Sequence, residues 1–528
     1  MKMPNKLTYL ASLSILCLLL LFVAPGCSGQ PAADQGDMGT YIIGDEEGDW
    51  GYPSPYGAYP RGPGYVRMSY LFDTLIWKDE DGFTEALAED WSFDEEELLY
   101  TFHLQDDVKW HDGRPFSAED VVFTYEYLEE NPYPWFDLDM VEEVNKVDER
   151  KVEIKLGKPY AAFLNNVVGV MPILPGHIWE DVEEPEDFTE PEAVVGTGPF
   201  RLEDYNREQG QYHYEANPEY HLGEPVVERL LMVKVSEPHL ALQRGDVDYA
   251  MVEPEAIDTL EGAGFVVEPG LHDWNLKLMF NHQEQPFEDN QFRQGLAHAI
   301  DLEEVVERAL RGHGLPGSSG MVSPDSQWFA GQEKLPDYNY DLEVARGVLE
   351  DLGYTYQEGS LKDHEGEPVK VEMLTMARFS REGELISGQL EELGLEVENR
   401  AVESSVLDNR IRNWDFDLAI TGHGGVGGDP EGFRNFMIGE ASPHINARYE
   451  HSELEDILEK QARELDETRR QELVTDMQKI YAEELPAYTL HYPTNYYAYR
   501  EEKVDWFFTT DGMAMGIPMP LNKLALIE

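Results

Sequence analysis

The stretch VKWHDGRPFSAEDVVFTY, residues 108–125, contains a turn followed directly by the start of a helix. Asp112-Gly113 is a turn dipeptide, because glycine adopts the positive φ that such turns need. Ser117, followed by Asp120, has the spacing of a capping box, in which each side chain satisfies an exposed backbone N–H group. Helical spacing of the next apolar residues then predicts an amphipathic helix, carried by Val121, Val122, Tyr125 and Leu128.

Strand and helix patterns alternate on both sides of this stretch. Residues 100–104 and 151–156 alternate apolar and polar side chains like half-buried strands, and residues 230–235 and 416–420 are further strand candidates. Residues 291–311 read as two helices, the second capped by Asp301, and Asp341 caps another helix that stops at Gly353. This interleaving predicts a mixed α/β protein with more than one domain.

The chain is extremely acidic. Its 528 residues carry 105 Asp and Glu against 40 Lys and Arg, a formal charge of −65. Such a charge disfavours binding to nucleic acid or to an anionic membrane surface. The acids are spread along the chain, as in residues 452–484, where Ser452 and Glu455 form a capping-box pattern and charges separate apolar residues at helical spacing. We interpret them as solvated surface, suited to a salty medium, rather than as a cation site.

The N-terminal segment predicts export. Lys2 and Lys6 precede an uncharged apolar run over residues 7–24, the layout of a secretory signal. Ala24-Pro25-Gly26-Cys27 resembles a bacterial lipobox, so residues 1–26 are expected to be a lipoprotein signal peptide, with Cys27 acylated and residues 27–39 a flexible tether. Cys17 is the only other cysteine, so no disulfide is expected to hold the exported protein.

No metalloprotease helix, phosphate-binding loop or nucleophile elbow occurs in the sequence. His111-Asp112 could be a metal pair, but a turn is the favoured interpretation, and no metal or other cofactor is expected. Residues 422–427, GHGGVG, match a dinucleotide fingerprint after a strand. Asp429-Pro430 then starts a new helix, so we expect this bare backbone to pack closely against a ligand or another lobe.

Several side chains are candidates for the wall of a binding site. Asp49, Trp50 and Tyr52 lie in a proline-rich aromatic stretch that suits stacking and hydrogen bonding. Trp274 and Trp414 have the same character, and His423 lies inside the glycine-rich loop. With Asp429 these form the expected ligand-binding set; packing of the same residues in the core is the alternative for each.

Ordered blocks along the chain resemble bacterial extracellular solute-binding protein family 5, which includes oligopeptide-, dipeptide- and nickel-binding proteins. Beside residues 108–125, the blocks are LFDTL (71–75), LAEDW (87–91), YTFHL (100–104), ILPGHIW (173–179), GTGPF (196–200), NPEY (217–220), LQRGDVD (242–248) and FRQGLAHAID (292–301).

The resemblance implies an α/β type II periplasmic-binding-protein fold, in which two lobes close about a hinge, plus an extra N-terminal domain. By analogy the first lobe takes residues 40–66, 190–280 and 491–528, the extra domain 67–189 and the second lobe 281–490. The crossings between lobes are expected near Phe280 and His491, and Trp274 is a candidate contact because residues 274–281 run into that hinge.

The implied function is capture of a small solute between the lobes and delivery to an ABC permease and its ATPase, without catalysis, by a lipid-anchored extracytoplasmic monomer. A peptide-like ligand is the first expectation, because peptide-binding members are frequent in this family. However, the acidic position that holds a peptide ammonium in the family falls on Val426, with Asp49 or Asp429 as substitutes. Oligosaccharide or chelated-metal binding, a secreted peptide or glycan hydrolase, and a receptor that signals to a membrane sensor remain as alternatives.

Overall fold

The computed structural model describes residues 39–509 and 521–527. The expected signal peptide, Cys27 and most of the tether therefore lie outside the described residues. Within the described ranges no helix is both long enough and apolar enough to cross a membrane.

The first sheet has seven strands in the order β12-β21-β11-β1-β10-β9-β8. Its central strand β1 is parallel to both neighbours, whereas the outer pairs are antiparallel. Two short helices, α4 and α5, pack on it in one apolar cluster. The elements are β1 Thr40–Asp45, β8 Phe200–Asn206, β9 Gln211–Ala216, β10 Arg229–Lys234, β11 Tyr249–Val252, β12 Val266–Pro269, β21 Tyr496–Tyr499, α1 Gly62–Ser69, α4 Pro238–Arg244 and α5 Ile257–Gly262.

A four-stranded antiparallel sheet, β4-β5-β7-β6, is inserted between β1 and β8 in the sequence. Helix α2 packs on it, and its cap is the predicted capping box of Ser117 and Asp120. The buried side chains of this insertion join those of the first sheet in one apolar cluster. The elements are β2 Ile76–Lys78, β3 Phe83–Glu85, β4 Ala88–Asp94, β5 Leu99–Leu104, β6 Val141–Asp148, β7 Lys151–Leu156, α2 Ala118–Glu130 and α3 Gly176–Trp179.

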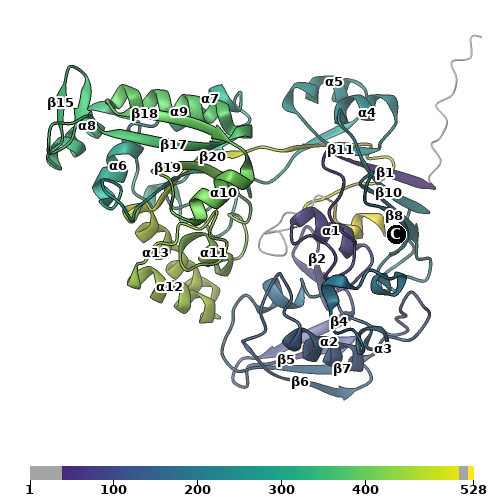
Figure 1. The fold of residues 1–528 in the computed structure, drawn as a ribbon. Coiled ribbons are helices and arrows are strands. Elements are labelled where there is room, and N and C mark those ends of the chain that lie inside the picture. The colour runs from purple at the N-terminus through teal and green to yellow at the C-terminus, as the bar shows by residue number, and fades with distance from the viewer. Residues whose placement is uncertain (1–38, 510–520, 528) are drawn as a thin grey trace, which may run out of the picture. The chain divides into compact units, whose positions relative to one another are not determined.

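The second large sheet has six strands in the order β14-β20-β13-β19-β17-β18. Helices α6 to α9 share an apolar cluster with one face of this sheet, in which the alternate β13 residues Leu276, Leu278 and Phe280 are buried. Figure 1 shows α7, α8 and α9 along β17 and β18. Helix α10 packs on the other face. The elements are β13 Asn275–Phe280, β14 Gly314–Pro316, β17 Lys370–Met376, β18 Glu396–Val402, β19 Leu418–His423, β20 Ala487–Pro493, α6 Asn290–His298, α7 Leu302–Ala309, α8 Leu342–Asp351, α9 Ser380–Leu393 and α10 Ser404–Arg412, with a small hairpin of β15 Thr355–Gln357 and β16 Ser360–Lys362.

Three helices form a separate apolar cluster that follows β19 in the sequence. They are α11 Arg434–Met437, α12 Ser452–Arg463 and α13 Glu467–Glu484. The capping box predicted at Ser452 is wrong. The cap is His451, whose Nδ1 accepts a hydrogen bond from the Leu454 N–H group, so Ser452 is already the first helical residue.

Two short segments connect the two large sheets. Residues 270–274 lead from β12 to β13, and residues 494–495 lead from β20 back to β21. The expected boundaries near Phe280 and His491 differ from this pairing, because β13 bonds to β19 and β20 and therefore belongs entirely to the second sheet. The pairing of β13 with β19 and β20 therefore fixes the boundary, and this pairing cannot be derived from the sequence alone.

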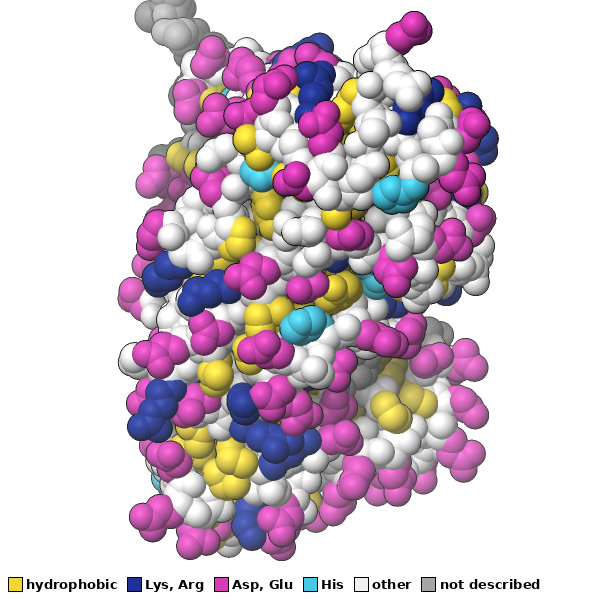
Figure 2. Space-filling model, turned by 90° about the vertical axis from the view of Figure 1, so that its left-hand side faces the viewer, with side chains coloured by type: hydrophobic (Ala, Val, Ile, Leu, Met, Phe, Trp, Pro, Cys, Tyr) yellow, Lys and Arg dark blue, Asp and Glu magenta, His cyan; other side chains and the backbone are white. Residues whose placement is uncertain are grey.

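Acidic side chains are spread over the surface. Figure 2 shows Asp and Glu scattered across the whole of one face, with Lys and Arg between them. This distribution agrees with solvated charge, and among the described residues no group of three or more His, Cys, Asp or Glu side chains is placed to hold a metal ion.

Candidate ligand-binding site

The two connecting segments lie side by side and are hydrogen bonded. The Gly270 N–H group donates to the Asn495 carbonyl at 2.8 Å. Between the segments, His272 Nε2 lies 2.7 Å from Thr494 Oγ1, and its Nδ1 lies 2.6 Å from the Asp325 carboxylate. Paired connecting segments with few residues are the natural place for a hinge between two rigid sheets.

Trp274 ends the first connecting segment, and its ring packs on the glycine-rich loop. A Cβ atom at Gly422 would overlap the Trp274 ring and the Asn275 carbonyl, so bare backbone packs closely here against the connecting segment and the start of β13, while the predicted packing against a ligand or another lobe stays a prediction. The half-buried ring also contacts Phe379, with centroids 5.5 Å apart, and the Arg378 guanidinium lies 5.5 Å from its centroid.

Asp273 precedes Trp274 and lies against the same loop. Its carbonyl accepts a hydrogen bond from Val426 N at 3.1 Å, and a Cβ atom at Gly424 would be 3.4 Å from the Asp273 carboxylate. Among the described residues no side chain or neighbouring backbone N–H group donates to that carboxylate, and burial raises its pKa to about 7. Val426 itself is fully buried in an apolar cluster, so the loop presents no charge at this position.

His423 is buried beside a lysine. Its Nε2 lies 3.0 Å from Lys277 Nζ, which also donates to the Ile445 carbonyl, and its ring stacks on Phe436 with centroids 3.9 Å apart. Burial lowers the pKa of Lys277 to about 7 and, together with the lysine charge, holds that of His423 well below its usual value. In this conformation His423 serves a polar pair in the interior; its role as a ligand contact stays a prediction.

Asp429 is the helix cap that the sequence predicts. Its carboxylate accepts from the Glu431 N–H group at 2.9 Å, with Pro430 in the first helical turn. Both carboxylate oxygens also receive hydrogen bonds from Arg470, at 2.9 and 2.7 Å, and both partners are almost fully buried. The Arg470 guanidinium lies 4.9 Å from the Trp328 ring centroid. The negative charge of Asp429 is therefore already balanced by the Arg470 guanidinium.

Asp49 is held by Tyr205 of the first sheet and by Tyr59 of the loop after β1. It accepts hydrogen bonds from Tyr205 at 2.5 Å and from Tyr59 at 3.1 Å. Burial favours the protonated form, but these hydrogen bonds outweigh it and lower the pKa of Asp49. Trp50 donates to Asp45 at 2.8 Å, and Tyr52 packs edge-on against Tyr205. These three candidates form one rigid cluster.

The aromatic cluster and the glycine-rich loop share no hydrogen bond among the described residues. Glu47, two residues before Asp49, lies close enough to Arg378 for its charge to raise the pKa of that guanidinium against the larger lowering by burial. Arg378 in turn lies over the Trp274 ring. Trp414 lies apart from both, before the opposite end of β19 from His423, with the Arg448 guanidinium 4.0 Å from its ring centroid. The structure therefore brings Trp274, His423 and Asp429 to one loop, groups Asp49, Trp50 and Tyr52 elsewhere, and separates Trp414.

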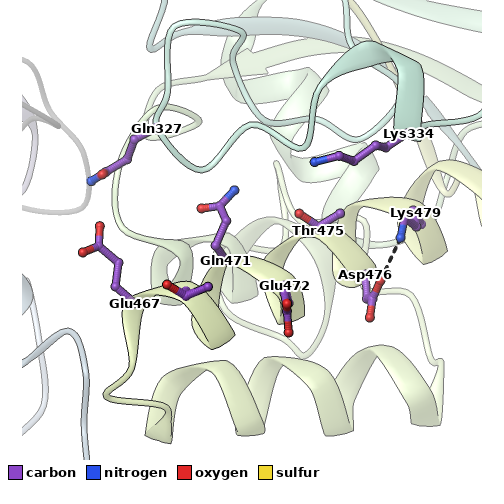
Figure 3. Close-up of a pocket in the computed structure, with 9 residues that line it drawn as sticks. Gln327, Lys334, Glu467, Gln471, Glu472, Thr475, Asp476 and Lys479 are labelled. Atoms are coloured by element: carbon purple, nitrogen blue, oxygen red, sulfur yellow. Dashed lines mark hydrogen bonds and ion pairs between the residues drawn. The ribbon is translucent and has the colours of Figure 1, made fainter.

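Two hollows meet near the Asp429–Arg470 pair. The larger, of about 720 Å³, runs along the exposed face of α13 and has no aromatic wall (Figure 3). The second, of about 420 Å³, lies between the inserted sheet and the α13 region, where Ala161 N donates to the Ala462 carbonyl at 2.8 Å. Rings and charges mixed in a concave wall are typical of ligand sites. Those of the second hollow are Phe83, Phe93, Tyr100, Trp328, Lys78, Glu95, Asp429, Glu464, Glu467 and Arg470.

His111 and Asp112 are hydrogen bonded to different partners around a turn, in which Gly113 has a φ of 88° and donates from its N–H group to the Trp110 carbonyl at 2.8 Å. His111 Nε2 donates to the Gly198 carbonyl at 3.0 Å, and its Nδ1 accepts from Gly196 N at 3.2 Å. Asp112 accepts from Arg114 N at 3.0 Å, and its other oxygen lies 2.9 Å from His177 Nε2. The turn interpretation is confirmed.

Sequence reasoning missed Asp273, Lys277 and Arg470. Lys277 lies two residues after Asn275 in β13, so strand alternation places these two on one face, whereas Asp273 precedes the strand and has no such signal. The signal for Lys277 was available once residues 274–281 were read as a strand. The pairing of Arg470 with Asp429 joins residues 41 apart and had no local signal.

Comparison with known proteins identifies the family. Residues 82–442 match the bacterial extracellular solute-binding proteins, family 5 Middle. The chain belongs to this family. Its members are substrate-binding components of ABC transporters that work outside the cytoplasm.

Individual relatives cover nearly the whole chain. The oligopeptide-binding protein AppA of Bacillus subtilis (strain 168) is 26% identical over 94% of this chain and 96% of its own length. Heme-binding protein A of Haemophilus influenzae is 27% identical over 77% of this chain and 79% of its own. The crystal structure of the ABC transporter substrate-binding protein CtaP from Listeria monocytogenes has a TM-score of 0.76 at 24% identity, covering 88% of this chain and 94% of that one. The last match shows the type II periplasmic-binding fold.

Proposed function

We propose that this solute-binding protein captures a short peptide or peptide-like molecule between lobes built on its two large sheets and delivers it to an ABC permease with its ATPase. The observation that carries the proposal is the pair of hydrogen-bonded connecting segments next to Trp274 and the glycine-rich loop. In this proposal the lobes meet at residues 270–274 and 494–495, and the inserted sheet is the extra domain.

The ligand class rests on the relatives. AppA is named for oligopeptide binding and aligns with 94% of this chain. Heme-binding protein A makes a chelated metal the second candidate. Since no group of three or more metal-ligating side chains occurs among the described residues, such a metal would arrive with its own chelator.

We further propose that the protein binds without converting its ligand, acts as a monomer and is anchored through acylated Cys27. A charge of −65 makes ionic attachment to an anionic membrane unfavourable, which favours a lipid anchor. Mass spectrometry of the protein isolated from membranes tests the anchor: we expect a diacylglycerol-modified Cys27, and an unmodified N-terminus would contradict it.

The ligand is tested by native mass spectrometry of the gently purified protein in a pool of short peptides. We expect one peptide-sized mass per protein, released unchanged; a chelate or sugar mass would replace the peptide proposal, and a cleaved product would favour the hydrolase. Two matched variants then locate the site, because both residues are half-buried tryptophans under an arginine. Trp274→Ala is expected to weaken binding at least about 10-fold, a typical loss for a buried aromatic contact, whereas Trp414→Ala leaves it unchanged.

A further inference from the structure

One carboxylate beside the connecting segments has no counter-charge. Asp273 is half-buried, and among the described residues it takes part in no ion pair and receives no hydrogen bond from another residue. The nearest lysine along the strand is committed elsewhere, since Lys277 Nζ is bonded to His423 and the Ile445 carbonyl. A carboxylate shielded from water without a partner is unfavourable, and a cation brought by a ligand removes that cost.

The other carboxylates of the candidate site are already paired. Asp429 makes both of its hydrogen bonds with Arg470, and Asp49 is bound by two tyrosines. Asp325 is in contact with His272. Asp273 is therefore the carboxylate of this group that is available to a ligand.

Bare backbone of the glycine-rich loop lies against one side of Asp273. A Cβ atom would lie 3.4 Å from the carboxylate at Gly424 and 3.8 Å from the Asp273 Cβ at Gly427, so the loop offers bare backbone there. The half-exposed Trp274 ring follows in the chain, and Tyr497 is a further neighbour, since burial and then the nearby Asp273 charge raise the pKa of its hydroxyl group. A small cationic head group with an apolar neighbour matches this combination of carboxylate, backbone and rings.

We propose that Asp273 is a specificity-determining residue that binds a protonated amine of the ligand, the free amino terminus of a short peptide. This inference rests on the proposed function. The loop has no charge at Val426, and the Asp273 carboxylate would supply that charge from the adjacent connecting segment. A hydrogen bond from the Val426 N–H group to the Asp273 carbonyl joins this segment to the loop.

The test measures calorimetric affinities of a peptide captured from the pool, with its amino terminus free and acetylated. We expect acetylation to weaken binding to the wild-type protein about 10- to 100-fold, the usual loss for a charge-assisted hydrogen bond. Asp273→Asn is expected to weaken binding of the free peptide equally and to leave binding of the acetylated peptide unchanged. Asp456→Asn removes a carboxylate from the exposed Lys460–Asp456 ion pair of α12, outside the connecting segments and the glycine-rich loop, and serves as the control.

The outcomes separate the two proposals. If the wild-type protein takes a peptide but acetylation and Asp273→Asn leave its affinity unchanged, the inference is overturned and the proposed function stands. If the wild-type protein takes no peptide, both fall. Because Asp273 has no partner, the Asn variant is expected to keep or raise the Tm; the acetylation arm uses wild-type protein and decides the question even if the variant fails to fold.

Discussion

The Asp429–Arg470 pair gives a predicted ligand contact a structural role as well. Asp429 follows a glycine-rich loop and precedes a proline, a position that suits ligand contact, and this role stays a prediction. In the fold its two oxygens are bound by Arg470, and both side chains are nearly inaccessible to solvent. Separating such a pair leaves a buried charge, which costs more than the pair itself contributes.

We expect Arg470→Met to destabilise the protein by about 3–5 kcal/mol, because the Asp429 carboxylate then has no counter-charge. The double variant Asp429→Asn/Arg470→Met is expected to recover part of that loss. Calorimetric Tm values of the single and double variants measure the coupling. Lys460→Met, which breaks the exposed Lys460–Asp456 pair, is the control and should cost less than about 1 kcal/mol. Equal losses in Arg470→Met and Lys460→Met would contradict this account.

His111 predicts a dependence of stability on pH. Its two ring nitrogens are used by Gly198 and Gly196, one as donor and one as acceptor, so the neutral ring fits and burial lowers its pKa to about 4. Between the unfolded pKa near 6.5 and this value the unfolded chain binds more protons, so stability falls as pH falls. We expect His111→Gln to remove about 1–2 kcal/mol of the loss between pH 7 and 5. Parallel Tm–pH curves for the two proteins would contradict this.

Residue identities in the site were only partly predictable. Trp274 was chosen from its place before a strand, and the structure puts it on the glycine-rich loop. Asp429 was correctly read as a cap, but its partner lies on a helix 41 residues away and is set by tertiary packing. Asp273 was missed because an unpaired carboxylate is defined by the absence of neighbours, and this absence is visible only in three dimensions.

At the scale of elements, the close packing of β19 on the first connecting segment gives a direct test. A Cβ atom at Gly422 would overlap backbone and ring atoms, whereas one at Gly432 would meet no atom within 4 Å. We expect Gly422→Ala to cost about 1–3 kcal/mol through overpacking and Gly432→Ala to change stability little. Denaturant unfolding of both variants measures this, and equal midpoints would show that the segment yields to the methyl group.

Local signals predicted elements well where the backbone itself selects the residues. The caps at Ser117, Asp301 and Asp341 are all present, since each side chain satisfies N–H groups of its own helix. The cap at Ser452 was misplaced by one residue because His451 can also accept the N–H hydrogen bond. The assignment of β13 to the first lobe differed because strand pairing joins β13 to β19, far away in sequence.

For the whole molecule, the family blocks predicted the α/β type II periplasmic-binding fold, which the comparisons confirm. The inserted sheet shares one apolar cluster with the first large sheet, so its stability is tied to that sheet rather than independent of it. The sequence alone places the lobe boundaries only to within about one strand, because no distinctive residue composition marks the connecting segments.

The net charge of −65 belongs to the molecule as a whole and makes its stability depend on salt concentration. Acidic side chains dispersed over the surface repel one another more in the compact state than in the unfolded chain. Salt shortens the range of that repulsion from about 30 Å at 0.01 M to about 3 Å at 1 M. We therefore expect the Tm to rise by several degrees between these concentrations of NaCl.

A variant with ten exposed, unpaired Glu residues changed to Gln should show a higher Tm at low salt and a smaller salt response. Sucrose at matched osmolality stabilises by exclusion without screening charge, and should raise the Tm of both proteins equally. A Tm that falls with NaCl in the wild-type protein would mean that its ion pairs, rather than its net charge, dominate the surface electrostatics.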